Sequence, residues 1–312
     1  MFFSIFGFAG GMGMPMQTSV NAQLGRRVGS PFIAALINFI VGFIALVILA
    51  VIVEHGLAIP MGKVFAAPPW ILTGAFFSVM FVTGNIVLLP RIGSVQTTIL
   101  SALGQIIMGT LIDTFGWFQS ATRPMGALRA LGVALVFGGV IVIILSKTRS
   151  AGAAPVAKTT LPKVKNVWLW RLFGLIVGMG MTSQTAVNAH LSVVVDSKLF
   201  ASVINFAVGI TLLVILNLAL LKTKKPGDKS GKAPAWILCG GFFGALFVFG
   251  NIITAQAVGT GMAVVIQLTG LMVGGLLVDQ FGLFRSAKRP VGYREILGVL
   301  IMVAGAAMFH LM

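Results

Sequence analysis

Charged side chains are scarce in this sequence of 312 residues: Asp, Glu, Lys and Arg together make up 9% of it, and only six residues are acidic. Hydrophobic residues account for 58%, and the mean hydropathy is +1.04. A water-soluble globule of this size needs more polar surface than that. The composition therefore excludes a soluble protein and indicates an integral membrane protein.

The groups that build most catalytic and metal centres are also few. The one cysteine, Cys239, permits neither a disulfide framework nor a cysteine metal site. Three histidines, His55, His190 and His310, lie far apart in the sequence. No Ser or Thr has a base partner in a shared motif, and no glycine-rich phosphate loop follows a strand. We therefore expect no enzyme activity, no metal and no cofactor.

Long apolar runs are what the sequence has instead. Each is close to the roughly 20 residues that a helix needs to cross a bilayer. None shows the alternating pattern of a barrel strand, so we expect helices. The ten predicted spans lie near residues 3–24, 32–53, 70–90, 94–112, 130–146, 170–191, 199–221, 235–255, 258–278 and 295–312.

The basic residues lie in the connectors between these runs and give a net charge of +16. They are not interleaved with aromatic residues that could stack on bases, so we expect no nucleic-acid partner. Eighteen of the 22 Lys and Arg fall in alternate connectors, beginning with Arg26 and Arg27. By the positive-inside rule these connectors are cytoplasmic and both termini lie outside the cytoplasm. The first run has no positive start and is expected to be a retained helix rather than a signal peptide.

The chain repeats itself halfway along. "GMGMPMQTSVNAQL" at 11–24 returns as "GMGMTSQTAVNAHL" at 178–191, and "FGWFQSATRP" at 115–124 returns as "FGLFRSAKRP" at 281–290. The shift is 167 residues at first and 166 after a one-residue gap. We therefore predict two five-helix repeats, 1–146 and 170–312, joined by a basic linker at 147–169.

Two copies of a unit with five spans must cross the membrane in opposite senses, which makes this an inverted repeat. The charges agree with that reading. Arg26 and Arg27 become Val193 and Val194 in the second copy, so the basic residues exchange loops between the copies. Each exchange restores the positive bias on the cytoplasmic side.

Amide side chains recur at matched positions in these apolar runs. Gln17 and Asn21 are four residues apart and share a helix face, and the depth of Asn38 in its span predicts that it meets Gln17. Such amides can simply join helices, but a set repeated at matched depths favours a substrate cavity between inverted halves. The span-centre glutamines Gln105 and Gln267 could add to it, although the repeat has Leu271 and Ser101 in their places. The predicted substrate-binding residues are Gln17, Asn21, Asn38, Asn85, Gln184, Asn188, Asn205 and Asn251.

Carboxylates are absent from the middle of the predicted spans. Asp113 and Asp279 end their spans, where we expect them to anchor the helix ends by pairing with Arg123 and Arg289. The functional alternative is that Asp113 and Asp279 are proton-coupling carboxylates that move between exposed and buried states.

The stretches "QTSVNAQLGRRVGSPFIAALINFIVG", "GAFFSVMFVTGNIVLLPRIG" and "GQIIMGTLIDTFGWF" resemble the YdcZ-like family of bacterial inner-membrane proteins in the drug/metabolite transporter superfamily. Members of that family are similar to one five-helix unit, and this chain resembles two units fused. The resemblance implies a multi-pass protein of the bacterial inner membrane that transports, and by its family exports, a small solute. More distant relatives, the small multidrug resistance proteins, carry a membrane glutamate where this chain has the neutral Gln17 and Gln184.

The fold class predicted is therefore an all-α integral membrane protein with ten transmembrane helices in two inverted repeats, similar to drug/metabolite transporters. We expect a secondary transporter that works by alternating access, with a small-molecule substrate, the lipid bilayer as surroundings, and a monomeric or homodimeric state. The alternatives are an inverted-repeat channel, a cationic drug exporter that uses Asp113 and Asp279, and a membrane scaffold without transport.

Overall fold

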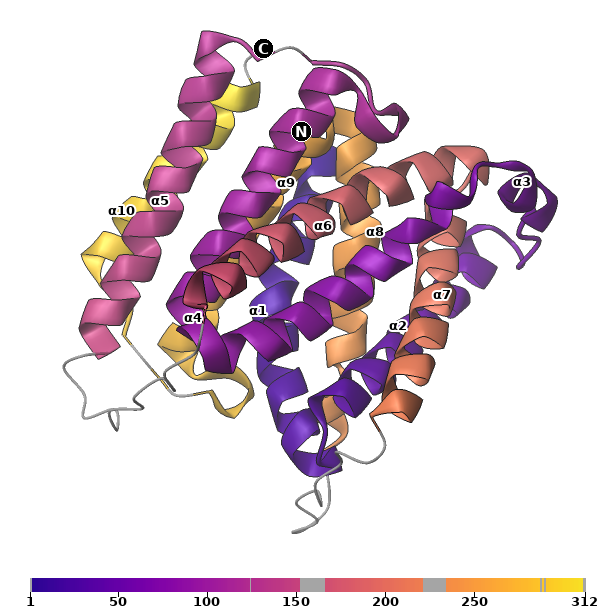
Figure 1. Cartoon of the computed structure of the whole chain (residues 1–312), viewed down its shortest axis with the longest axis horizontal. Helices are drawn as coiled ribbons and strands as arrows, with labels where there is room; N and C mark the ends of the chain where they lie inside the picture. The colour runs from indigo at the N-terminus through magenta and orange to yellow at the C-terminus, as the bar shows by residue number, and fades with distance from the viewer. Residues whose placement is uncertain are drawn as a thin grey trace.

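The structure, a computed structural model, describes residues 2–123, 125–151, 166–220, 234–286, 288 and 290–310, and every regular element in these ranges is a helix (Figure 1). Helices satisfy every backbone hydrogen bond internally, as a bilayer requires. The long helices are α1 (Phe2–Val28), α2 (Pro31–Val53), α4 (Thr73–Phe115), α5 (Ala127–Ala151), α6 (Val167–Val194), α7 (Lys198–Ala219), α8 (Gly240–Val258), α9 (Thr260–Phe281) and α10 (Tyr293–His310). The short elements are α3 (Met61–Ala66) and the 3-10 turns η1 (Pro69–Leu72), η2 (Trp117–Gln119), η4 (Ala235–Leu238) and η5 (Leu283–Arg285).

Matched serine caps start the second helix of each repeat. Ser30 accepts a hydrogen bond from the Ile33 amide at the start of α2, and Ser197 accepts one from the Phe200 amide at the start of α7. Each cap satisfies one of the amide hydrogens that a helix start leaves without a partner. The repeat seen in the sequence is thus also a repeat of local structure.

The third and fourth predicted spans are not separate helices. Both lie on α4, which runs without a break from Thr73 to Phe115 and changes direction partway along (Figure 1). The sequence places Pro90 between the two apolar segments, and a proline inside a helix can bend it without ending it. In the second repeat, Gly259 with φ +88° does separate α8 from α9.

The first helix of each repeat packs against the other repeat. Helix α1 lies against α8 and α9, and α6 lies along α4. Glycines permit this close approach, because a Cβ on Gly11 would come within 3.0 Å of the Gln267 carbonyl oxygen, and one on Gly178 equally close to that of Ser101. The two contacts are the same contact made twice, with the roles of the two repeats exchanged.

Matching helices of the two repeats run antiparallel where they meet. Along α2 and α7, Asn217 donates to the Phe32 carbonyl, the rings of Phe39 and Phe206 lie 5.0 Å apart, and Ser197 donates to Glu54. Residue numbers rise along one helix as they fall along the other. Helices α5 and α10 behave alike at the opposite side of the molecule, since Gly139 faces Gly298 and Gly305 faces Gly132 (Figure 1).

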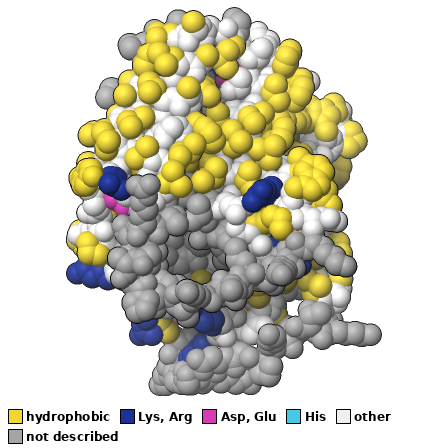
Figure 2. Space-filling view, turned by 60° about the vertical axis from the view of Figure 1, so that its left-hand side comes forward, with side chains coloured by type: hydrophobic (Ala, Val, Ile, Leu, Met, Phe, Trp, Pro, Cys, Tyr) yellow, Lys and Arg dark blue, Asp and Glu magenta, His cyan; other side chains and the backbone are white. Residues whose placement is uncertain are grey.

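Six segments of the described chain are long and apolar enough to cross a membrane: Pro31–Val53, Pro69–Leu88, Gln96–Phe115, Lys198–Ala219, Ala235–Val258 and Thr260–Phe281. The other four predicted spans coincide with α1, α5, α6 and α10, which carry more glycine, polar or charged residues. Hydrophobic side chains cover the upper part of the face in Figure 2, and the Lys and Arg visible there lie lower down. The predicted linker falls largely outside the described residues.

Candidate functional site

Two groups of amide side chains lie at matched positions in the fold. We call Gln17, Asn21 and Asn38 the first amide cluster. In it, Asn38 donates to the Oδ1 of Asn21 and to the Ala34 carbonyl oxygen, the latter at 2.8 Å. Asn21, rather than the predicted Gln17, is therefore the residue that bonds Asn38. The crossing of α1 and α2 brings Asn21, one turn beyond Gln17, to Asn38.

The second repeat supplies part of the first amide cluster. A Cβ on Gly240 of α8 would lie within 3.0 Å of the Oδ1 atoms of both Asn21 and Asn38, and one on Gly244 would lie 2.7 Å from the Nε2 of Gln17. Because glycine has no side chain, the backbone of α8 can lie directly against these amide groups. The cluster is therefore built from α1, α2 and α8, that is, from both repeats.

We call Gln184, Asn188, Asn205 and Ser78 the second amide cluster. Asn188 donates to the Oδ1 of Asn205 at 3.1 Å, and Asn205 donates to the Oγ of Ser78 at 3.3 Å. A Cβ on Gly74 of α4 would lie within 3.0 Å of the Asn188 Oδ1, just as one on Gly240 would in the first cluster. Gln184, Asn188 and Asn205 are all at most 3% exposed. Helix α4 of the first repeat thus closes a cluster that otherwise belongs to the second.

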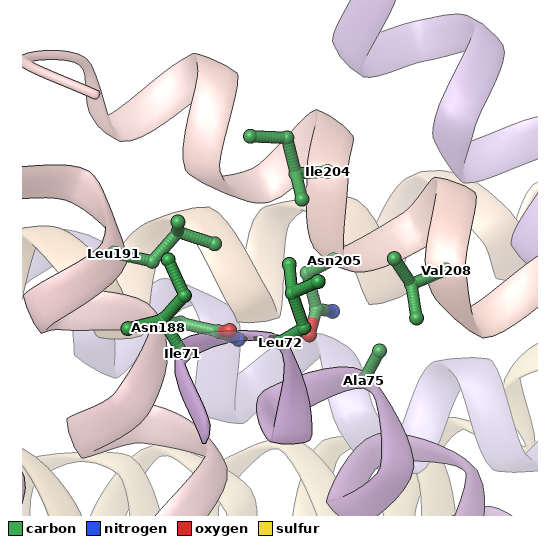
Figure 3. Close-up of a pocket in the computed structure, with 8 residues that line it drawn as sticks. All are labelled: Ile71, Leu72, Ala75, Asn188, Leu191, Ile204, Asn205 and Val208. Carbon is green, nitrogen blue, oxygen red and sulfur yellow. Dashed lines mark hydrogen bonds between the residues drawn. The ribbon is translucent and has the colours of Figure 1, made fainter. Parts of the chain in front are cut away.

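A small pocket borders the second amide cluster, with Asn188 and Asn205 on one side and aliphatic side chains around them (Figure 3). It encloses about 130 Å³ including its open mouth, and it leaves no room for a water-sized molecule in this conformation. The aliphatic lining residues are Ile71, Leu72, Ala75, Leu191, Ile204 and Val208. The helices are therefore closed around the amides.

Three further amides form a chain between the repeats, which we call the central amide chain. Asn251 donates to Gln267 at 2.8 Å, and Gln267 donates to Gln105 at 3.1 Å. Thr182 donates to the Gln105 backbone carbonyl at 3.1 Å. All three amide residues are at most 3% exposed. The chain joins α8 and α9 of the second repeat to α4 of the first.

The repeat pattern gave too little weight to Gln105 and Gln267, because neither has a glutamine at its matched position. Their signal in the sequence was a glutamine near the centre of a span. Ser78 and Thr182 gave no such signal, since hydroxyl residues are common in membrane helices. Asn85 was predicted in the site, but it is half-buried and donates to the Phe81 carbonyl of its own helix at 2.9 Å.

Matched amides differ in their exposure. Gln17, Asn21 and Asn85 of the first repeat are half-buried, whereas Gln184, Asn188 and Asn251 of the second are almost completely buried. The two repeats therefore have different surroundings in this conformation although their contacts correspond.

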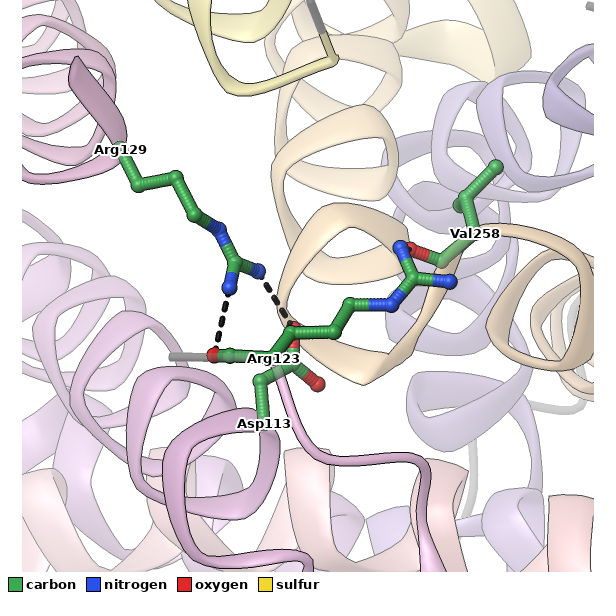
Figure 4. A network of polar contacts seen from close by, with 4 residues as sticks. All are labelled: Asp113, Arg123, Arg129 and Val258. Atoms are coloured by element: carbon green, nitrogen blue, oxygen red, sulfur yellow. Dashed lines mark hydrogen bonds and ion pairs between the residues drawn. The ribbon is translucent and has the colours of Figure 1, made fainter. Parts of the chain in front are cut away.

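Asp113 forms a buried ion pair with a different arginine from the one expected. The Nη2 of Arg129 lies 3.0 Å from the Asp113 Oδ2, and the two side chains are 9% and 2% exposed (Figure 4). The predicted partner, Arg123, instead donates to the Val258 carbonyl at the end of α8. Arg129 also donates to the Arg123 carbonyl at 2.6 Å. The group therefore fixes the end of α4 and reaches across to the second repeat.

The second repeat differs from the first at the position of Arg129. The residue that corresponds to Arg129 is Glu295, which accepts a hydrogen bond from the Gly292 amide at 3.0 Å and so caps the start of α10. Asp279 is half-buried, and its predicted partner Arg289 lies outside the described residues. Within the described part of the chain, no three His, Cys, Asp or Glu side chains come together as metal ligands would.

The regular elements of the described residues are helices, and several are apolar enough to span a membrane. This fold indicates a multi-pass membrane protein. Comparison with known proteins gives the family. The model of the family described as "Putative inner membrane exporter, YdcZ" matches residues 2–142 and again residues 169–308. The chain belongs to this family, in a form with two units, and is a protein of the inner membrane.

One curated relative is "Inner membrane protein YdcZ" of Escherichia coli (strain K12), which is 27% identical over 136 residues. The match covers 89% of that protein but 43% of this chain, so the relative corresponds to a single unit. A solved structure titled "Crystal structure of protein" has a TM-score of 0.72 at 12% identity and covers 99% of this chain and 97% of its own. That likeness supports the fold alone.

Proposed function

We propose that the protein is a secondary transporter that exports a small solute by alternating access at a site between two inverted five-helix repeats. The observation that carries the proposal is that a helix of the other repeat completes each amide cluster. Gly240 of α8 lies against Asn38, and Gly74 of α4 lies against Asn188. A relative movement of the repeats would uncover one cluster and cover the other. Such a movement around a fixed site is how inverted-repeat transporters work.

The proposal includes ten spans and opposite orientations of the two repeats. The antiparallel contacts of α2 with α7 and of α5 with α10 support it, as does the exchange of basic residues between matched loops. With Lys and Arg on the cytoplasmic side, the first amide cluster lies toward the cytoplasm and the second toward the outside.

The substrate proposed is neutral or weakly polar. The clusters consist of amide and hydroxyl groups, which donate and accept hydrogen bonds but cannot neutralise a full charge in a medium of low dielectric constant. Asp113 is already paired with Arg129, which favours an anchoring role over coupling. A cationic drug exporter coupled through Asp113 and Asp279 is the second candidate, and it requires that pair to separate.

Orientation is tested by cysteine labelling in a Cys239→Ser background with a reagent that does not cross membranes. We expect a cysteine in the connector 222–232 to be protected in intact cells and a cysteine at Gly62 to be labelled. Labelling of both from outside would refute the inverted arrangement. A channel is distinguished in proteoliposomes, where a secondary transporter shows saturation and dependence on a gradient.

A further inference from the structure

Two of the buried amides have a carboxamide oxygen with no hydrogen-bond partner at the place where the other repeat covers them. Among the buried side-chain atoms of the described residues, the unpartnered ones include the Oδ1 of Asn38 and the Oδ1 of Asn188. Both residues are at most 2% exposed. A buried acceptor without a donor is destabilising and calls for an explanation in a native structure.

In both clusters a backbone carbonyl orients the hydrogen-bonded asparagines; the second cluster also holds the unpartnered Oε1 of Gln184. The Nδ2 of Asn38 faces the Ala34 carbonyl, which can only accept, so the oxygen of Asn38 is the open atom. In the second cluster the Ser78 hydroxyl lies closer to the Gly74 carbonyl, at 3.2 Å, than to the Asn205 Oδ1, at 3.5 Å, and it accepts from the Asn205 Nδ2 at 3.3 Å. Asn205 then turns its oxygen to the Nδ2 of Asn188, and the Asn188 oxygen is left open.

The surroundings of these oxygens limit what could pair with them. The hydrogen-bonded residues of the two clusters are neutral, and the walls of the pocket are aliphatic, with Leu191 and Val208 at its two sides (Figure 3). A carboxylate or phosphate offers only acceptor oxygens, which cannot form a hydrogen bond with the open asparagine oxygens. A quaternary ammonium would bring a charge without a donor. A neutral group with N–H or O–H donors on an apolar body fits both features.

The glycines that cover these oxygens also indicate a solute with hydrogen-bond donors. A glycine of the opposite repeat lies over each of these two asparagine oxygens, Gly240 over Asn38 and Gly74 over Asn188. A glycine supplies no side-chain donor, so the oxygen stays unpaired while the repeats are closed on it. When the repeats separate, the glycine moves away and the oxygen becomes accessible to a solute in the opened space.

We propose that the Asn38 and Asn188 oxygens are the recognition points of the transport site, one for each side of the membrane, and that they select small neutral solutes whose N–H or O–H donors sit on an apolar body, such as primary amides and alcohols. The inference rests on the proposed function, since it names the substrate class of that site.

The test uses four probes with the same six-carbon body: hexanamide, N,N-dimethylhexanamide, hexanoate and hexyltrimethylammonium. Saturable binding to the purified full chain in detergent is measured by calorimetry, with protein-free micelles subtracted. We expect hexanamide to bind at least about tenfold more tightly than the dimethylamide, since one hydrogen bond of about 1.4 kcal/mol is worth that factor. Hexanoate and hexyltrimethylammonium should bind no better than the dimethylamide.

Variants assign the effect to the site. Asn188→Leu should reduce the difference between the two amides, and Asn38→Leu/Asn188→Leu should abolish it. Thr211→Val, at a hydroxyl that bonds the Ala207 carbonyl of its own helix, should keep the difference. If Asn188→Leu does not fold, Asn188→Asp keeps the acceptor and should add binding of the trimethylammonium probe. Equal binding of both amides, preference for hexanoate, or binding of none of the four would overturn the inference. Saturable transport of any other solute in vesicles would leave the proposed function standing in those cases.

Discussion

Removing one member of the Asp113–Arg129 pair should destabilise the protein more than removing both. Asp113→Asn leaves the Arg129 guanidinium charged at a site where its side chain is 9% exposed. An uncompensated buried charge costs about 3 to 5 kcal/mol. We expect the lower part of that range, because Arg129 keeps its hydrogen bond to the Arg123 carbonyl. Arg129→Gln should cost about as much, since Asp113 then loses its ion-pair partner and keeps the Gly261 amide and the neighbouring Arg123 charge.

The double variant Asp113→Asn/Arg129→Gln removes both charges and leaves two amides that can bond each other. Its expected loss is about 1 kcal/mol, well below the sum of the single losses. Unfolding of the purified protein in detergent measures all three variants against the exposed control Arg26→Gln, for which the change should stay within about 0.5 kcal/mol. Additive losses, or a single variant as stable as the wild type, would refute the buried-pair reasoning.

Two further predictions concern the packing and the amides. Gly178→Ala should destabilise by about 1 to 3 kcal/mol because its Cβ meets the Ser101 carbonyl, whereas Gly138→Ala, with nothing within 4 Å, should be neutral or stabilising when both are compared by unfolding in detergent. Gln17→Ala and Gln184→Ala should each lower vesicle transport strongly while changing stability by only about 0.6 to 2 kcal/mol; normal transport by both at normal expression would place the site elsewhere.

The second candidate function predicts a different use of the same carboxylate. If Asp113→Asn abolishes saturable transport of a quaternary ammonium compound while the folded protein is retained, Asp113 belongs to the functional centre. If the variant transports a neutral solute at the wild-type rate once its stability is allowed for, the ion pair is an anchor.

The sequence alone predicted the helical structure and the two-unit organisation of this protein. The apolar runs predicted helices, and the described chain is helical throughout its regular elements. The repeated motifs predicted a two-unit member of the YdcZ-like family, which the two matches of the family model confirm. Both properties follow from local composition and from self-similarity, and these are present in the order of the residues alone. The count of ten spans and the inverted arrangement are still predictions.

Which side chains meet was decided only by the tertiary structure. Asn38 bonds Asn21 and not Gln17, Asp113 pairs with Arg129 and not Arg123, and Gln105 meets Gln267 without a matched partner. A sequence gives the depth and the face of a residue on its own helix. It does not give the angle at which two helices cross, and a shift of one turn brings a different side chain to the contact. Because the first helix of each repeat packs against the other repeat, contacts such as that of Gly11 with Gln267 join residues more than a hundred positions apart, and only the packed chain determines them.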